Sequence, residues 1–204
     1  MSARGKLITL EGVDGAGKSS HIRFIADALE AQGHPVLVTR EPGGTDLAER
    51  LRQAILEEPM DPIAETLMIL AARADHVTKV IRPGLEAGIW IVCDRFSDAT
   101  VAYQGAGKGV PLKLIEVLGS AAHSGLRPDR TLVFDCTYEV ARQRLAATGK
   151  KLDRFEREDG AFFERVRNAY LALAKAEPER MRIIDARADL AGVRSALEKN
   201  LVFS

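Results

Sequence analysis

The chain of 204 residues has only two cysteines, no excess charge and no long apolar run, and each shortage excludes a class of protein. Cys93 and Cys136 each stand alone at the end of an apolar run, which argues against a disulfide scaffold, a redox pair or a metal site. We expect them to be small buried hydrophobes in a reducing cytosol. Lys and Arg together number 29, as do Asp and Glu, so no global field attracts nucleic acid or an anionic membrane.

No stretch approaches the length of a membrane span, and the first residues, Met1–Lys6, lack the apolar core of a signal peptide. We therefore expect a cytoplasmic protein with no membrane partner. Hydrophobic residues make up 46% of the chain, which indicates a globular fold with a sizeable core. There is no internal repeat, low-complexity segment or linker, so residues 1–204 are expected to form a single domain.

Short β-rich runs alternate with helical patterns along the chain. Strands are expected at residues 6–10, 35–39, 89–93, 130–135 and 181–185, and helices at 18–32, 47–57, 62–87, 112–122, 138–147, 160–176 and 190–200. The runs Trp90–Val92 and Leu132–Phe134 are apolar throughout, as in strands buried on both faces of a parallel sheet. Pro83 is expected to kink or divide the third helix. Alternating β and α units predict a doubly wound α/β fold, which binds ligands at the carboxyl ends of its strands.

A glycine-rich segment follows the first expected strand. Residues Gly12–Ser19 fit the pattern G-x-x-x-x-G-K-[ST], the P-loop, between the apolar run Leu7–Leu10 and a helical pattern that begins with Ile22. Its glycines let backbone N–H groups wrap an anion, and the following helix adds the positive end of its dipole. Lys18 would place a positive charge at the β- and γ-phosphates, and the Ser19 hydroxyl would bind Mg²⁺. We therefore expect a nucleoside triphosphate to bind here; the alternative is a glycine turn without a ligand.

Polar segments also follow the second and third expected strands. The run Thr39–Thr45 is consistent with a Pro-Gly turn capped by Asp46, with Glu49 as its partner. Asp94 ends the third strand, where a carboxylate beside a P-loop is well placed to hold Mg²⁺. Arg95 offers a planar fork suited to a phosphate. The alternative for these two residues is a structural ion pair at a strand end.

Six cations lie between Arg142 and Arg157, on either side of Thr148-Gly149. Such a cluster is usually a solvated face, although a basic gap between helices is also typical of a mobile flap over phosphates. The stretch Lys150–Asp153 approaches the guanine-reading signature of GTPases. It lacks the leading Asn or Thr and follows no strand, so we discount it.

Taken together, these segments resemble bacterial thymidylate kinases (dTMP kinases), and the match runs along nearly the whole chain. The family's T-R-E-P-G-G-T run stands at Thr39–Thr45, and its Asp-Arg segment with A-Y-Q-G stands at Asp94–Gly105. Its A-A-R helix is found at Ala71–Arg73; from the helical pattern alone, an ordinary surface arginine and a site residue are equally open interpretations of Arg73. Its lid sequence, L-D-R followed by acidic residues, is found at Leu152–Arg154.

The resemblance implies a P-loop NTPase fold of the nucleoside monophosphate kinase type. Its five-stranded parallel sheet would be flanked by helices, with a short basic lid at about residues 148–158. ATP would be the phosphate donor, with Mg²⁺ held by Ser19 and Asp94. The expected ATP-binding residues are Gly12, Val13, Asp14, Gly15, Ala16, Gly17, Lys18, Ser19, Ser20 and Arg144. For adenine itself, Arg144 and the turn after Asp185 are the candidates.

On the acceptor side, the resemblance implies dTMP as the substrate. Asp14 would face the sugar 3′-hydroxyl, Arg95 would grip the 5′-phosphate, and Tyr103 would crowd the place of a ribose 2′-hydroxyl. Arg73, Thr100 and Gln104 would read the thymine edge. The expected substrate-binding residues are Asp14, Arg40, Pro42, Ile69, Arg73, Arg95, Thr100, Tyr103 and Gln104.

The resemblance also implies where the catalytic cation comes from. Residue 15 is glycine and the lid is rich in Arg and Lys, so the chain is similar to the branch of the family in which the lid supplies that cation. Arg154 is the leading candidate. The expected catalytic residues are Lys18, Arg95, Arg154 and Asp14.

Two positions depart from the family pattern. Many members have a Phe that stacks on thymine where this chain has Ile69, and some have a Ser where it has Ala99. Apolar packing replaces stacking only partly, because aromatic pairs gain about 0.5–1.5 kcal/mol beyond area burial. These departures concern the details of base recognition rather than the reaction.

The implied reaction is phosphoryl transfer from ATP to dTMP, giving dTDP and ADP, in dTTP synthesis. The alternatives are another nucleoside monophosphate kinase, acting on dUMP or a purine nucleotide, and a nucleotide-hydrolysing switch. The absence of a strand-end Asp-Glu pair and of a genuine guanine signature argues against the switch. The family forms homodimers through long helices; the pattern at residues 62–87 would serve, although core burial explains its apolar stripe equally well.

Overall fold

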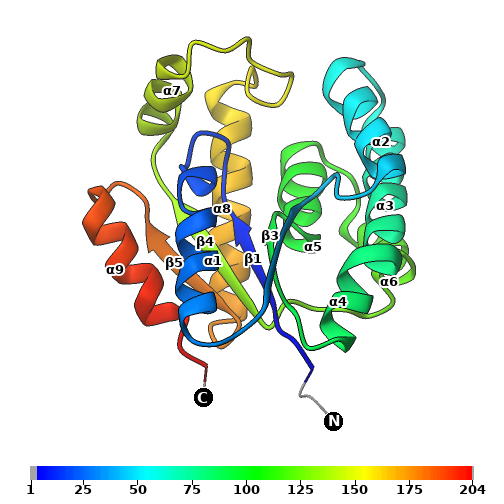
Figure 1. Ribbon diagram of the computed structural model, residues 1–204. Helices are drawn as coiled ribbons and strands as arrows, with labels where there is room; N and C mark the ends of the chain where they lie inside the picture. Colours follow the sequence, from blue (N-terminus) through cyan, green and yellow to red (C-terminus); the bar gives the residue numbers. More distant parts are fainter. Residues whose placement is uncertain (1–3, 204) are drawn as a thin grey trace.

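Apolar strands form the centre of the molecule, and helices cover both faces of the sheet that they build (Figure 1). The computed structural model describes residues 4–203; residues 1–3 and 204, part of the expected N-terminal segment and single domain, lie outside the described residues. The strands are β1 Leu7–Glu11, β2 Val36–Arg40, β3 Trp90–Asp94, β4 Arg130–Asp135 and β5 Met181–Asp185. They pair in parallel in the order β2-β3-β1-β4-β5. The predicted five-stranded α/β sheet is confirmed, and each strand lies within one residue of its predicted position.

Most of the helices also lie where the periodicity places them. They are α1 Ile22–Ala31, α2 Asp46–Glu57, α3 Pro62–His76, α4 Arg82–Glu86, α5 Ser97–Thr100, α6 Leu112–His123, α7 Tyr138–Ala147, α8 Gly160–Ala176 and α9 Leu190–Asn200. A 3₁₀ turn, η1 Lys18–Ser20, precedes α1, and two π-helical segments are η2 Val77–Ile81 and η3 Val101–Gly107. The last three α-helices begin and end at the predicted residues.

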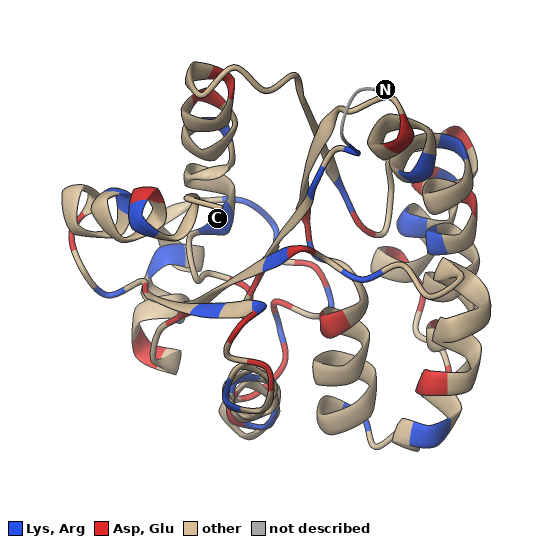
Figure 2. Ribbon diagram, turned by 90° about the horizontal axis from the view of Figure 1, so that it is seen from below, with Lys and Arg blue, Asp and Glu red and all other residues tan. Residues whose placement is uncertain are grey.

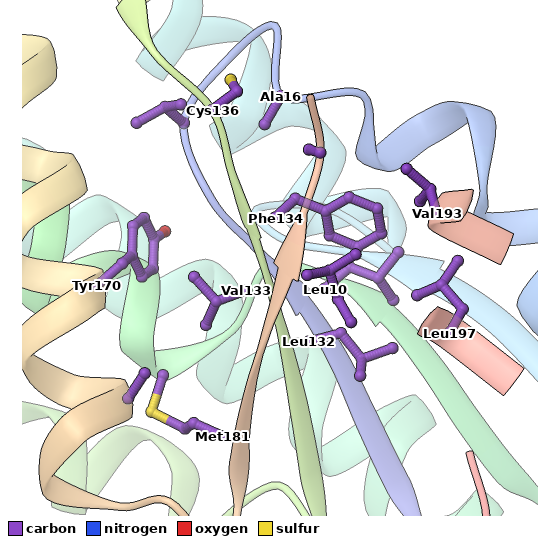
Figure 3. Packing of buried hydrophobic residues seen from close by; sticks show 14 of the residues in the cluster. Leu10, Ala16, Leu132, Val133, Phe134, Cys136, Tyr170, Met181, Val193 and Leu197 are labelled. Carbon is purple, nitrogen blue, oxygen red and sulfur yellow. The ribbon is translucent and has the colours of Figure 1, made fainter. Parts of the chain in front are cut away.

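Alternate side chains of β4 enter two parts of the core on opposite faces of the sheet (Figure 3). Leu132 and Phe134 point toward Leu197 of α9, whereas Val133 points toward α8, which contributes Tyr170. The three β4 side chains are at most 1% exposed. Burying each of them stabilises the fold by about 1.5–3 kcal/mol. The prediction that this strand is buried on both faces is confirmed.

The long helical pattern predicted at residues 62–87 is divided, as expected from Pro83. Helix α3 ends at His76, η2 follows it, and α4 begins at Arg82. Pro83 has no N–H and so cannot donate to the carbonyl of Lys79, as an α-helix requires. The wider π-helical turns of η2 precede this interruption.

Helix α5 and the π-helical segment η3 follow β3, where the sequence pattern predicts no helix. Gly105 and Gly107 lower the helix propensity of this segment. Close packing explains Gly107, since a Cβ there would lie 2.6 Å from Cε2 of Phe162 in α8. Tertiary contact therefore overrides local propensity in the segment that carries three of the expected substrate-binding residues.

Charges of both signs are interspersed over the outer helices in the view from below (Figure 2), in line with the equal counts of acidic and basic residues. Both cysteines are buried and free, as predicted. Within residues 4–203, no helix combines the length and the apolar character needed to cross a membrane.

Candidate active site

The loop between β1 and η1 owes its path to glycine. Gly12, Gly15 and Gly17 have φ angles of 130°, 81° and 94°, in the region that favours glycine. A Cβ would lie 2.4 Å from the Phe134 carbonyl oxygen at Gly12, and 2.5 Å from that of Ala141 at Gly15. Successive N–H groups along such a path form a nest for an anion at the start of the helix.

Lys18 lies against the loop that it follows. Its Nζ donates to the carbonyl oxygens of Gly12 at 3.0 Å and Val13 at 3.1 Å, and the residue is 6% exposed. Burial, and then the nearby charge of Arg95, lowers the pKa of Lys18 below its ordinary value. A phosphate in the loop would supply the opposite charge that favours the ammonium form.

The P-loop forms one wall of a cleft of about 640 Å³. The expected site residues that line this cleft are Asp14, Gly15, Ala16, Gly17, Lys18, Ser19, Ser20, Arg40, Asp94, Arg95 and Arg144. Ser19 and Asp94 therefore share the cleft, and Asp94 Oδ1 is buried with no hydrogen-bond partner among the described residues. An unpartnered carboxylate oxygen in a cleft with a serine hydroxyl fits Mg²⁺, which takes one or two protein oxygens and keeps phosphates and waters as its other ligands.

Arg95 connects the P-loop to the rest of the site. Its φ of 68° is unusual for a residue with a side chain. Its guanidinium donates to the Gly12 carbonyl at 2.9 Å, to Asp14 at 2.6 Å and to the Tyr103 hydroxyl at 2.9 Å. Burial alone would lower the pKa of Arg95, but Asp14 and the neighbouring phenols hold it well above its usual value, so Arg95 stays a cation.

Asp14 faces two cations and one phenol. Besides Arg95, it accepts a hydrogen bond from the Tyr103 hydroxyl at 2.8 Å. Burial would raise the pKa of Asp14, but the charges of Arg95 and Lys18 and the Tyr103 hydrogen bond bring it below its ordinary value. The carboxylate is thus ionised and held in place at the junction of the P-loop and the η3 segment.

A second, smaller cavity of about 90 Å³ shares Asp14 and Arg95 with the cleft and is more apolar. The expected substrate-binding residues in it are Asp14, Pro42, Ile69, Arg73, Arg95, Thr100, Tyr103 and Gln104. Arg40 lies in the cleft instead, paired with Glu49 at 2.9 Å. The structure thus brings eight residues from five segments of the chain around one cavity.

Arg73 is 2% exposed, so its interpretation as a surface arginine is wrong. Its Nε donates to Glu41 at 2.5 Å, its Nη1 to the Thr100 hydroxyl at 3.0 Å and its Nη2 to the Phe96 carbonyl at 3.0 Å. His76 Nδ1 lies 3.1 Å from the other oxygen of Glu41. A buried carboxylate compensates this buried guanidinium, and two of its five N–H groups remain for a ligand.

The turn after β2 is capped by Thr45 rather than by Asp46. Thr45 has an extended backbone and its hydroxyl accepts from the Ala48 N–H at 3.1 Å, whereas Asp46 already belongs to α2. Glu49 acts as the expected partner, accepting from the Gly44 N–H at 3.0 Å. The same segment that caps α2 therefore delivers Glu41 and Pro42 to the small cavity.

The lid, residues 148–158, connects α7 to α8 (Figure 1). Arg154 lines neither cavity: its Nε donates to the Ile55 carbonyl of α2 and its guanidinium pairs with Glu65 of α3. Lys150 does line the cleft, although its Nζ is paired with Glu156 at 2.6 Å. Arg154 and Lys150 therefore each have specific partners within the protein.

The two candidates for adenine contact, Arg144 and the turn after β5, are in direct contact. Arg144 Nη1 donates to the Ala16 carbonyl at 3.1 Å and its Nη2 to the Ala186 carbonyl at 2.7 Å. Ala186 directly follows Asp185, so the P-loop, Arg144 and the turn after β5 meet at one end of the cleft.

Sequence reasoning missed Arg52, which lines both cavities and donates to the Pro42 carbonyl at 3.0 Å. Burial, more than the nearby Arg40, lowers the pKa of Arg52. Arg52 lies in the amphipathic helix α2, where a polar residue is ordinary, so the sequence does not mark it as a site residue. Glu41 was also missed, although its position inside the T-R-E-P-G-G-T run was available as a signal.

Comparison with known proteins gives a consistent answer. A family model described as thymidylate kinase matches residues 10–197. The thymidylate kinase of Bordetella petrii is 53% identical over 201 residues, covering 98% of this chain and 97% of that protein. The one from Pseudomonas syringae pv. tomato is 52% identical over 200 residues, covering 97% and 95%. A solved thymidylate kinase from Ehrlichia chaffeensis superposes with a TM-score of 0.79 at 31% identity, covering 98% of this chain and 99% of its own.

Proposed function

The chain belongs to the thymidylate kinase family, and we propose from that premise that it transfers a phosphoryl group from ATP to dTMP, giving ADP and dTDP. The observation that carries the proposal is the pair of adjoining cavities, one walled by the P-loop and one by the expected nucleoside-binding residues. Asp14 and Arg95 line both of them. A donor in the cleft and an acceptor in the small cavity would meet at these two residues.

The chemistry needs little covalent work from the protein. The 5′-phosphate of the acceptor is already an anionic nucleophile, so no general base is required. Its difficulty is repulsion from the γ-phosphate, which positioning and charge neutralisation overcome. Lys18 on the donor side and Arg95 on the acceptor side are placed to screen the two anions. Ser19 and Asp94 would hold Mg²⁺, which would supply further neutralisation of phosphate charge.

We propose that Arg154 supplies the remaining cation when the lid closes. To reach the phosphates it has to leave Glu65, since it lines neither cavity in this structure. Closure would also exclude water, which competes as a phosphoryl acceptor.

The small cavity supports dTMP as the acceptor. Ile69 and Ala99 line it and offer an apolar surface to a pyrimidine, and Arg73 and Gln104 offer polar atoms to its edge. Tyr103 is 7% exposed and fixed by Asp14 and Arg95. Because it cannot move aside without losing both partners, we propose that it disfavours a ribose 2′-hydroxyl.

A substrate panel tests the proposal. Purified protein with ATP and magnesium would be offered dTMP, dUMP, ribothymidine monophosphate and dGMP, with ADP release followed in a coupled assay. We expect dTMP to be the best acceptor and the ribonucleotide to be poor. ADP release that does not depend on any monophosphate would instead indicate a hydrolysing switch, and a preference for dGMP would indicate another monophosphate kinase.

We also propose that the enzyme is a cytoplasmic homodimer. Helices α3 and α6 pack side by side, and both carry large apolar side chains that are about half exposed or more. These are Ile63, Leu67, Leu112 and Val117. Pairing of these two helices between two copies would remove such side chains from water. Sedimentation velocity that finds only a monomer at micromolar concentration would contradict the dimer.

A further inference from the structure

Gln104, at the edge of the small cavity, is held from behind by a buried carboxylate. The residue is 2% exposed, and its Nε2 donates to Oε1 of Glu65 at 2.8 Å. Glu65 lies in the first turn of α3 and is fully buried. Its other oxygen accepts from Lys108 Nζ at 2.7 Å and also pairs with Arg154.

This contact decides which end of the Gln104 amide faces the cavity. An amide has a donor end and an acceptor end of nearly the same shape, and its neighbours must fix the choice. Glu65 pairs with Lys108 and with Arg154, and an ionised carboxylate only accepts hydrogen bonds. Turning the amide over would set a carbonyl oxygen against that anion in a buried place, at the cost of an unpaired buried acceptor.

The side-chain oxygen of Gln104, Oε1, is therefore left for a ligand. Among residues 4–203, Oε1 accepts no hydrogen bond, and the residue lines the small cavity together with Arg73. Arg73 offers only donors, and Glu41 and Thr100 fix its guanidinium. The wall of the cavity thus presents a donor group and an acceptor group as fixed neighbours.

That pair complements one kind of pyrimidine edge. A base with a carbonyl next to a ring N–H, as in thymine or uracil, can accept from Arg73 and donate to Gln104. Cytosine has the opposite pattern, an amino donor next to an unprotonated ring nitrogen. Its amino group would face the donor Arg73, and its ring nitrogen would face the acceptor oxygen of Gln104. Sites built around such a hydrogen bond strongly reject analogues that lack the matching group.

We propose that Glu65 is a specificity-determining positioning residue, which fixes the Gln104 amide so that the site accepts a pyrimidine with an N–H at ring position 3 and rejects cytosine. The inference rests on the proposed function, because it assigns the small cavity to the acceptor base. It does not separate dTMP from dUMP, which share this edge.

The substitution Glu65→Gln tests the proposal. A glutamine at position 65 can donate or accept, so either orientation of the Gln104 amide becomes possible. The readout is the ratio of kcat/KM for dTMP to that for dCMP, since the absolute rate also responds to the lost partner of Arg154. We expect the ratio to fall at least about tenfold. Lys108→Gln is the matched control, because it removes one partner of the same carboxylate but leaves the Gln104 contact, and its ratio should equal that of the wild type.

An unchanged ratio in Glu65→Gln would overturn the inference alone, whereas a wild type inactive on dTMP would overturn the proposed function and the inference with it. If Glu65→Gln does not fold, the complex of the wild type with dTMP provides a second test of the proposal. The imino proton of bound dTMP, observed by NMR, should be protected from exchange with water by its hydrogen bond to Gln104. An imino proton that exchanges freely in the complex would contradict the proposal.

Discussion

Glu11, the last residue of β1, shows at the scale of single residues how a buried group shapes the site. Its Oε1 accepts from the Phe96 N–H at 2.7 Å and its Oε2 from the Tyr170 hydroxyl at 2.7 Å. Phe96 follows Arg95, whose φ is positive, so this carboxylate supports the turn from which the Arg95 guanidinium reaches the P-loop. Burial, and then the charge of Asp98, raises the pKa of Glu11 to about 7.

This shift predicts a pH-dependent loss of stability. Between the ordinary value of 4.5 and about 7, the native state keeps the Glu11 proton and the unfolded state does not. Stability therefore falls as pH rises through this window. Relative to Glu11→Gln, the wild type should lose about 1–3 kcal/mol of unfolding free energy between pH 5 and pH 8. Urea unfolding of both proteins at pH 5 and pH 8 measures this loss. An equal change of unfolding free energy in wild type and Glu11→Gln would show that Glu11 does not titrate between these pH values.

Residues with a backbone signature could be predicted from the sequence, and residues defined only by tertiary contact could not. The glycines and Lys18 follow from the P-loop pattern, and Arg95 from its place at the end of a strand. Arg52, Glu11 and Glu65 carry no such signal, because their roles depend on helices and strands brought together from distant parts of the chain. For Arg73 the helical pattern alone left a surface position and a site equally open, and its resemblance to the family's A-A-R helix indicated the site.

The lid is an ordered element with caps of its own. Asp153 Oδ1 accepts from the N–H groups of Phe155 at 2.9 Å and Glu156 at 3.0 Å, and Glu156 accepts from the Asp153 N–H at 3.0 Å. This reciprocal arrangement is a capping box, readable in the sequence as D-x-x-E. It fixes a turn from which Arg154 reaches Glu65. The sequence identified the basic segment as a flap or a solvated face, but its docking onto α2 and α3 needed the fold.

At this scale we predict the effect of Arg154→Ala. If the lid delivers this cation to the transferred group, turnover should fall at least about a hundredfold, since such arginines are worth roughly 10³–10⁵ in rate. ADP affinity should remain unchanged, because the P-loop is intact. Steady-state kinetics together with ADP titration measures both quantities. Arg157→Ala is the comparator, because Arg157 is exposed and its side chain bonds, among residues 4–203, only within the lid. Near-normal turnover in Arg154→Ala would show that Arg154 is not the catalytic cation of the lid. A loss of turnover in Arg157→Ala instead would assign that role to Arg157.

At the scale of the whole molecule, the order of the strands in the sheet brings the separate segments of the site together. β1 lies between β3 and β4, with Leu10 opposite Asp94. The P-loop and the Asp94-Arg95 pair therefore leave adjacent strands at the same edge of the sheet. Hydrophobic periodicity predicted the strands to within a residue but not their order, because alternating β and α units are compatible with several orders. The alternating pattern supplied the doubly wound α/β class, and the family resemblance supplied the nucleoside monophosphate kinase type within it.

The proposed phosphoryl transfer depends most on the donor and acceptor phosphates meeting between the P-loop and Arg95. The measurement that tests this most directly is isothermal titration of Arg95→Ala and wild type with dTMP and with ADP, after circular dichroism confirms the fold. Removing one partner of a buried charged contact costs about 2–5 kcal/mol. The dissociation constant for dTMP should therefore rise at least about thirtyfold, while that for ADP stays within about threefold. Undiminished dTMP affinity in Arg95→Ala, or an equal loss for both nucleotides, would contradict the account.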